Sequence, residues 1–252
     1  SYVVKTCSLK IAFDKKTGIL NSVERNGVRI PLSNGPFIIG RAAPLKDVVC
    51  RKINDTVRLS VTYENNNRFS WMVTTDGLLH LEVSYMPENN NLFSGITFNF
   101  PEQDVAGMRW LGKGPYRVYK NRMKSAAFGL WEKAYNNTVT GESGYIYPEF
   151  KGYHAETYWA EIKGKQDTGF TAYVFSEDVF LRMLTPQPPA RPAKTALEYP
   201  PGDISFLHSI NAIGTKFNIN QGPQAAPTQF YPVKIYEGAL SLKLAFDFRE
   251  GL

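Results

Sequence analysis

Residues 78–85 read Leu-Leu-His-Leu-Glu-Val-Ser-Tyr, and every second residue from Leu79 onward is apolar. Successive side chains of an extended chain point to opposite faces, so this stretch predicts a strand with one face on a core. The closing stretch, residues 240–248, reads Leu-Ser-Leu-Lys-Leu-Ala-Phe-Asp-Phe and has the same period of two. Both stretches indicate a β-protein.

The same alternation recurs along the chain. Further runs are Val3, Cys7, Leu9, Ile11 and Phe13, then Val57, Leu59, Val61 and Tyr63, then Ile96, Phe98 and Phe100. Asn26-Gly27 lies between two short apolar runs and predicts a hairpin with a type I′ turn. Only residues 125–135 have a helix-like pattern, which Gly129 weakens. Short strands with regular turns predict an all-β fold, a large antiparallel β-sandwich that residues 1–252 form as a single domain.

The composition is that of an ordinary globular protein, with 43% hydrophobic and 21% charged residues. A chain of this length buries roughly 70–75% of its unfolded surface, so its core needs no metal or disulfide staples. No stretch approaches the ~18 consecutive apolar residues of a membrane helix, and we expect no membrane partner. The net charge of +6 comes from scattered Lys and Arg residues with no run longer than two, so we expect no nucleic-acid partner.

The two cysteines, Cys7 and Cys50, are too few for a zinc site of the CxxC kind or a disulfide framework. They are either two buried free thiols or one bridge between two strands in an oxidising compartment. The chain begins at Ser1 rather than Met, and we expect it to be a piece of a longer protein.

No motif for metal, phosphate or nucleophile chemistry is present. The three histidines, His80, His154 and His208, do not have metal-ligand spacing. There is no phosphate loop and no GxSxG nucleophile elbow. Carboxylates such as Glu149 and Glu156 are interpreted as solvated surface groups, because no spacing among them sets the ~5–10 Å separation of glycoside hydrolysis. We therefore expect no metal, no cofactor and no catalytic residue in this chain.

Aromatic residues are unusually dense between residues 110 and 159. Aromatic rings present apolar faces on which the C–H surfaces of sugars can stack, while their polar edges suit a wet groove. The twelve rings are those of Trp110, Tyr116, Tyr119, Phe128, Trp131, Tyr135, Tyr145, Tyr147, Phe150, Tyr153, Tyr158 and Trp159.

Residues 110–122, WLGKGPYRVYKNR, resemble the W-x-G-x-G-P-x-E-x-Y-x-D-R signature of the C-terminal small-chain domain of family 2 β-galactosidases. Residues 13–20, FDKKTGIL, resemble the opening F-D-K-x-T-G-x-L hairpin of that domain. Residues 35–44 resemble a shortened G-P…W-R-A-P, and residues 147–159 resemble P-Q-E-N-G-x-[RH]-x-D-x-R-W. Residues 210–214 resemble the later H-x-G-x-G strand, so the matches follow the family order along most of the chain.

The chain departs from the family pattern at charged positions. The family Glu of G-P-x-E is Arg117, and the Asp before the signature Arg is Asn121. The Q-E-N triplet is Glu149-Phe150-Lys151. Acidic or amide positions have thus become basic or apolar, which reverses the local charge.

The resemblance implies a galactose-mutarotase-like supersandwich. In the family this domain follows a TIM barrel that holds both catalytic glutamates, so the resemblance implies a domain that supports the barrel, lines the rim of a carbohydrate site and is inactive alone. The implied partners are the barrel of the same polypeptide and a galactoside-like glycan. The implied location is the bacterial periplasm or the cell exterior, with the cytoplasm as the alternative.

Residues 110–122 and 149–159 carry the strongest resemblance, and we expect them to form one carbohydrate-facing surface. Tyr153 and His154 follow Gly152 and are expected at a loop tip. Residues 112–115, Gly-Lys-Gly-Pro, predict a tight turn at a strand end. The candidate carbohydrate-binding residues are Trp110, Tyr119, Arg122, Tyr153, His154, Glu156 and Trp159. The alternative to sugar binding by Arg122 is a structural pair between Arg122 and Glu156.

Two other functions fit the same pattern. The first alternative is a stand-alone carbohydrate-binding module. Less favoured is a mutarotase-like aldose epimerase, which needs a histidine acid and a carboxylate base on one concave sheet face. His154 and Glu156 are two residues apart and share a face on a regular strand, but the N-H-x-Y type segment of true epimerases is missing.

Overall fold

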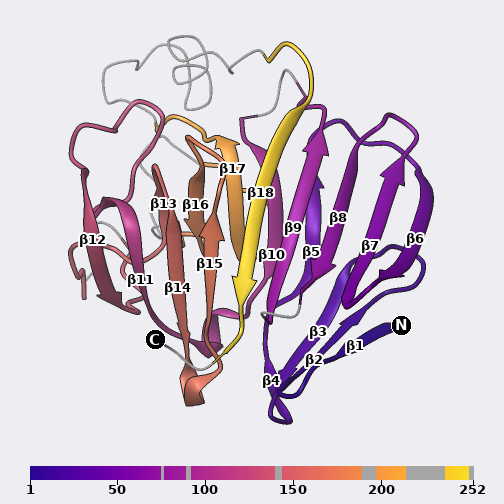
Figure 1. The fold of residues 1–252 in the computed structure, drawn as a ribbon. Helices are drawn as coiled ribbons and strands as arrows, with labels where there is room; N and C mark the ends of the chain where they lie inside the picture. The colour runs from indigo at the N-terminus through magenta and orange to yellow at the C-terminus, as the bar shows by residue number, and fades with distance from the viewer. Residues whose placement is uncertain (75–76, 89–91, 140–143, 189–196, 214–235, 250–252) are drawn as a thin grey trace.

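The computed structural model describes most of the chain, namely residues 1–74, 77–88, 92–139, 144–188, 197–213 and 236–249. Within these residues eighteen strands form two antiparallel sheets of nine strands each (Figure 1). The described helices are two single turns, η1 (Glu102–Asp104) and η2 (Lys165–Asp167). None of the described helices has the length and apolar character needed to cross a membrane. The predicted all-β antiparallel sandwich is confirmed.

The first sheet runs from the N-terminal strands to a short strand in the middle of the sequence. Its order is β1 (Tyr2–Lys5), β2 (Leu9–Phe13), β3 (Leu20–Arg25), β5 (Ser33–Ile39), β10 (Ser94–Asn99), β17 (Ile204–Ser209), β16 (Phe180–Met183) and β13 (Gly152–His154), with β4 (Val28–Ile30) paired to β3.

The second sheet faces the viewer in Figure 1. Its order is β12 (Ala127–Ala134), β11 (Val105–Gly114), β14 (Trp159–Gly164), β15 (Phe170–Val174), β18 (Leu240–Asp247), β9 (Leu78–Tyr85), β8 (Arg68–Val73), β7 (Thr56–Tyr63) and β6 (Leu45–Ile53). The last strand of the sequence, β18, therefore lies in the centre of this sheet.

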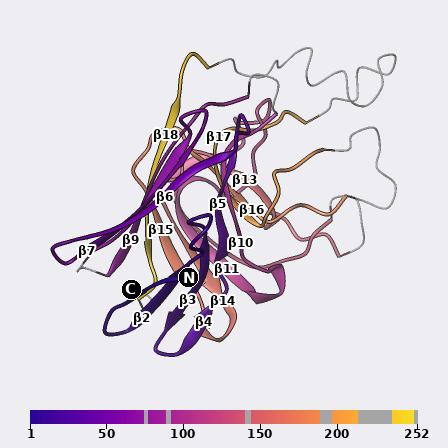
Figure 2. The same ribbon diagram turned by 90° about the vertical axis from the view of Figure 1, so that its right-hand side faces the viewer.

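The two sheets pack face to face, with β6, β9, β15 and β18 in one layer and β5, β10, β13 and β16 in the other (Figure 2). Trp71 of the second sheet lies at the centre of the core. Its ring centre is 5.6 Å from that of Phe13 and 6.3 Å from that of Phe98, both in the first sheet. These rings reach the core because Phe13, Trp71 and Phe98 each lie on the apolar face of a strand whose residues alternate between apolar and polar.

The first alternating run is two strands rather than one. β1 and β2 pair with each other, with Val3 opposite Ala12. The turn between them forms because the amide of Thr6 donates to the carbonyl oxygen of Leu9 (2.8 Å) and the Leu9 amide donates to the Thr6 hydroxyl (3.1 Å). Cys7 lies in this turn and is exposed, and both cysteines are free thiols, so the prediction that Cys7 is buried is wrong.

The hairpin prediction at Asn26-Gly27 is confirmed. Both residues have positive φ, 50° and 81°, as a type I′ turn requires, and they connect β3 to β4.

The helix-like pattern of residues 125–135 is wrong. Residues 127–134 form β12, which pairs along its full length with β11 from Gly107–Ala134 to Gly114–Ala127. A strand is favoured because it aligns Trp131 with Trp110 and Leu130 with Leu111, one pair on each face of the sheet.

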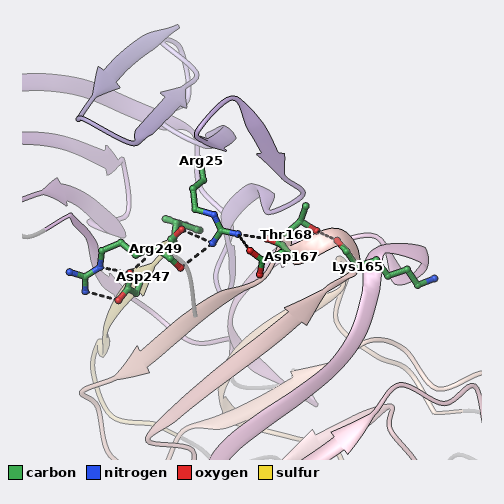
Figure 3. Close-up of polar contacts among 7 residues, drawn as sticks. Arg25, Lys165, Asp167, Thr168, Asp247 and Arg249 are labelled. Atoms are coloured by element: carbon green, nitrogen blue, oxygen red, sulfur yellow. Dashed lines mark hydrogen bonds and ion pairs between the residues drawn. The ribbon is translucent and has the colours of Figure 1, made fainter. Parts of the chain in front are cut away.

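A buried arginine joins the two sheets at one end (Figure 3). Arg25, the last residue of β3, donates through Nη1 to the carbonyl oxygens of Phe248 and Arg249, both at 3.0 Å. Its Nη2 contacts the carbonyl oxygen of Asp167 and lies 3.2 Å from the Asp167 carboxylate. One guanidinium therefore connects a strand of the first sheet to the end of β18 and to η2.

Candidate functional site

The two signature segments lie side by side, as the sequence predicts. Val118 and Tyr153 form a β-bridge, in which the Val118 amide donates to the Tyr153 carbonyl oxygen at 2.8 Å. The Lys113 amide donates to the Ala155 carbonyl oxygen at 2.8 Å. The Tyr158 amide in turn donates to the Leu111 carbonyl oxygen at 2.9 Å. Backbone pairing therefore holds residues 110–122 against residues 149–159.

Most of the candidate aromatic residues in these segments are buried. Trp110, Tyr153 and His154 are 0% exposed, and Tyr119 is almost as fully covered. The loop-tip prediction for Tyr153 and His154 is wrong, because both lie in β13, where Tyr153 pairs with Arg182 of β16. Apart from Trp159, which is half-buried, these aromatic side chains fill the core instead of presenting a surface in this structure.

Glu156 pairs with Lys113 rather than with Arg122. The Lys113 ammonium lies 2.5 Å from the Glu156 carboxylate, so the predicted pair of Arg122 and Glu156 is wrong. Arg122 is exposed. Its backbone amide donates to the Tyr119 carbonyl oxygen at 2.8 Å.

His154 and Glu156 do not form an accessible acid–base pair. The His154 ring packs against Trp110, with ring centres 4.7 Å apart, and is fully buried. Burial, and secondly the positive charge of Lys133, lower the pKa of His154 well below its ordinary value, so the imidazole is neutral. Because Glu156 is paired with Lys113, the geometry that an epimerase requires is not formed here.

Glu149 is buried within an ionic cluster, so its assignment to the solvated surface is wrong. Its carboxylate lies 3.0 Å from Nη2 of Arg117, and both side chains are largely buried. The Lys133 ammonium donates to the Glu149 carbonyl oxygen at 2.8 Å and lies 5.2 Å from the Trp110 ring centre. A buried charge needs such partners, which explains why these residues converge.

Three tyrosines form an exposed stack next to this cluster. The Tyr116 and Tyr147 rings have centres 4.8 Å apart with planes at 19°, and Tyr145 stacks on Tyr147 at 5.8 Å and 21°. Tyr145 is 44% exposed and Tyr147 is 57% exposed. We call these three residues the tyrosine stack. These three rings belong to the dense aromatic region, but none of them is among the predicted carbohydrate-binding residues. The spacing of two between Tyr145 and Tyr147 is the signal in the sequence that points to them.

A sequence model of the beta galactosidase small chain family matches residues 44–186, which is more than half of the chain. The chain belongs to this family. The match contains both signature segments and the tyrosine stack, and it confirms the small-chain resemblance read from the residues. Residues 13–20 and 210–214 of the chain lie outside the match, and Gly214 also lies outside the described residues.

The chain has no significant match among curated proteins. Among solved structures it is similar to the GalM/aldose epimerase homologue from C. elegans. The sequence identity is 8%, the TM-score is 0.47, and the comparison covers 98% of each chain.

The charge departures of this small-chain domain are compensated locally. Arg117, at the family Glu position, is neutralised by Glu149. The Lys151 ammonium lies 2.5 Å from the Glu102 carboxylate. The side-chain nitrogen of Asn121 donates to the Ile213 carbonyl oxygen at 2.8 Å, and its side-chain oxygen accepts from the backbone amide of Ile213 at 2.9 Å. The substituted positions therefore form a consistent set of internal contacts.

Lys133 makes the stability of the small-chain domain depend on pH. Burial lowers the pKa of its ammonium to about 7, although the charge of Glu149 opposes this shift. An unfolded lysine titrates near ~10.4, so between about pH 7 and 10 the unfolded chain binds more protons and the contribution of Lys133 to stability rises with pH. We expect the melting temperature of the wild type to rise relative to that of Lys133→Met between about pH 7 and 9.

Thermal unfolding of both proteins across this range measures the effect. The same substitution at Lys163, whose ammonium pairs with Glu132 on the sheet surface, is the matched control for the loss of a lysine side chain. A wild-type minus Lys133→Met difference that does not change between pH 7 and 9 would contradict the prediction.

Proposed function

We propose that this small-chain domain is a non-catalytic part of a β-galactosidase-type glycoside hydrolase, where it supports the catalytic barrel and lines the rim of a carbohydrate site. The tyrosine stack carries this proposal. It exposes aromatic side chains within the region that matches the family, and aromatic rings suit the C–H surfaces of a pyranose. Galactoside is the sugar class that the family name suggests.

The stack is held in place before any ligand arrives. Tyr116 precedes Arg117 in the chain, and Tyr147 lies two residues before Glu149, so the buried pair of Arg117 and Glu149 fixes both supporting loops. Ordering these loops in advance lowers the entropy cost of binding. A stand-alone carbohydrate-binding module is the second candidate, since the same exposed rings would serve it without a barrel.

Site-resolved NMR tests the role of the stack. We expect galactose or lactose to shift the backbone amide signals of residues 116–118, 144–147 and 149. The dissociation constant should be millimolar, which corresponds to about −4 kcal/mol, because the barrel contributes no contacts. Tyr147→Ala should weaken binding at these signals by about tenfold, since it removes the central ring. Phe175→Ala, which removes another exposed ring, is the matched control and should bind as the wild type does.

The outcomes separate the candidates. Unshifted signals in these segments at saturating sugar, or equal affinity in Tyr147→Ala, would refute the rim role. Micromolar affinity would favour the stand-alone module. The domain alone should not turn over aryl β-galactosides; turnover that persists through repurification and disappears on mutation of a carboxylate would show that it is catalytic.

A further inference from the structure

A second aromatic surface lies on the outer face of the second sheet, where β11, β14 and β15 run side by side (Figure 1). Trp159 of β14 lies directly opposite Tyr173 of β15. Both rings are half-exposed. The neighbouring residues Ala160 and Ala172 point to the opposite face of the sheet and are fully buried. The two rings therefore point away from the core, on elements that do not carry the tyrosine stack.

Two charged side chains lie beside these rings in the next row of the sheet. Arg109 and Glu161 are opposite each other on β11 and β14, and Thr171 follows on β15. The Arg109 guanidinium is 5.8 Å from the Trp159 ring centre. Within the described residues, neither this guanidinium nor the Glu161 carboxylate makes a hydrogen bond or a close ion pair, although Arg109 lies opposite Glu132 of β12 and acts electrostatically on its carboxylate. One charged donor group and one charged acceptor group thus remain available.

These five residues line one cleft. Its volume is about 320 Å³, and Arg109, Trp159, Glu161, Thr171 and Tyr173 form its walls. Ligand pockets for small molecules start near ~300 Å³, so the cleft accommodates one sugar ring rather than a long chain.

We propose that this sheet-face cleft binds a neutral pyranoside. The apolar face of the sugar stacks on Trp159, Arg109 donates to its hydroxyls, and Glu161 accepts from them. One positive and one negative group favour a ligand without net charge, because an acidic sugar would meet Glu161 and a cationic one would meet Arg109. This site goes beyond the proposed rim function, since it uses other strands and no contact with a barrel.

NMR on the Tyr147→Ala variant isolates this cleft from the tyrosine stack. We expect lactose to shift the Trp159 indole N–H signal and the amides of residues 159–161 and 171–173 even in that variant. Adding Trp159→Ala should weaken the remaining binding by about tenfold, because it removes the stacking ring. Trp159→Phe should retain most of it, and Phe128→Ala, an exposed ring on neighbouring β12, should have no effect.

Three results would overturn the proposal. They are an unshifted Trp159 signal with lactose and cellobiose, equal affinity in Trp159→Ala, and tighter binding of glucuronate than of lactose. If Trp159→Ala does not fold, Glu161→Gln replaces it: weaker lactose binding supports the site, and unchanged binding refutes it. Because the tyrosine-stack signals report the rim function separately, failure here leaves that function untouched.

Discussion

Replacing Arg25 by methionine is expected to lower the free energy of unfolding by about 3 kcal/mol, because it leaves buried acceptors without a donor. The side chain is only 8% exposed. It donates to the carbonyl oxygens of Phe248 and Arg249, and methionine of similar length offers no hydrogen to either. The loss falls where β3 meets the end of β18 and η2.

Urea unfolding of the variants measures this loss. Arg25→Lys should recover only part of it, since an ammonium cannot reproduce the planar fork that reaches several acceptors. Asp167→Asn should cost less than about 1 kcal/mol, because the Asp167 side chain is 78% exposed and its ion pair is screened by water. Arg51→Met, which changes an exposed arginine on β6, is the control. An Arg25→Met variant as stable as this control would show that the carbonyl contacts contribute nothing.

Gly112→Val is expected to destabilise the domain by about 3 kcal/mol, because the side chain has no room. A Cβ atom at this position would lie 2.7 Å from the Glu156 carbonyl oxygen and 3.1 Å from the Ala155 carbonyl oxygen. Both are backbone atoms of the segment that pairs with β11, so neither can move without separating the two signature segments.

The reason differs from the turn that the sequence suggested. Gly112 and Gly114 both lie within β11, and neither belongs to the glycines with positive φ. Close approach, rather than a left-handed backbone, therefore requires glycine at position 112. Gly129→Val provides the matched control, since Gly129 pairs directly with Gly112 and a Cβ there meets only the Trp131 ring at 3.4 Å. Similar melting temperatures for the two variants would contradict this explanation.

The strands of the core were predictable because their alternation is long. The run from Leu79 to Tyr85 forms β9, and its apolar residues are buried. The run from Val3 to Phe13 is predicted as one strand and forms two, because a period of two does not show where the chain turns back on itself. Residues 125–135 were misread as a helix, because Trp131 and Leu130 face opposite sides of a sheet whose partner strand, β11, lies elsewhere in the sequence.

The pairing of the two signature segments was predictable, but the exposure of their side chains was not. Glu149 was assigned to solvent because nothing in the sequence indicates that Arg117 lies 3.0 Å away. His154 was assigned to a loop because β13 has three residues, too few for a visible period. The tyrosine stack depends on two loops meeting in space, which local patterns do not encode.

The central position of β18 has a consequence for synthesis of the protein. β18 is the strand that joins β15 to β9, so the second sheet consists of two unconnected halves until residues 240–247 are added. During translation the edges of β9 and β15 therefore present unpaired backbone groups until β18 has been made, and such edges are templates for aggregation. The second sheet closes only after all its other strands have been made, and such long-range pairing is intrinsically slow and exposes the chain to aggregation while it is incomplete.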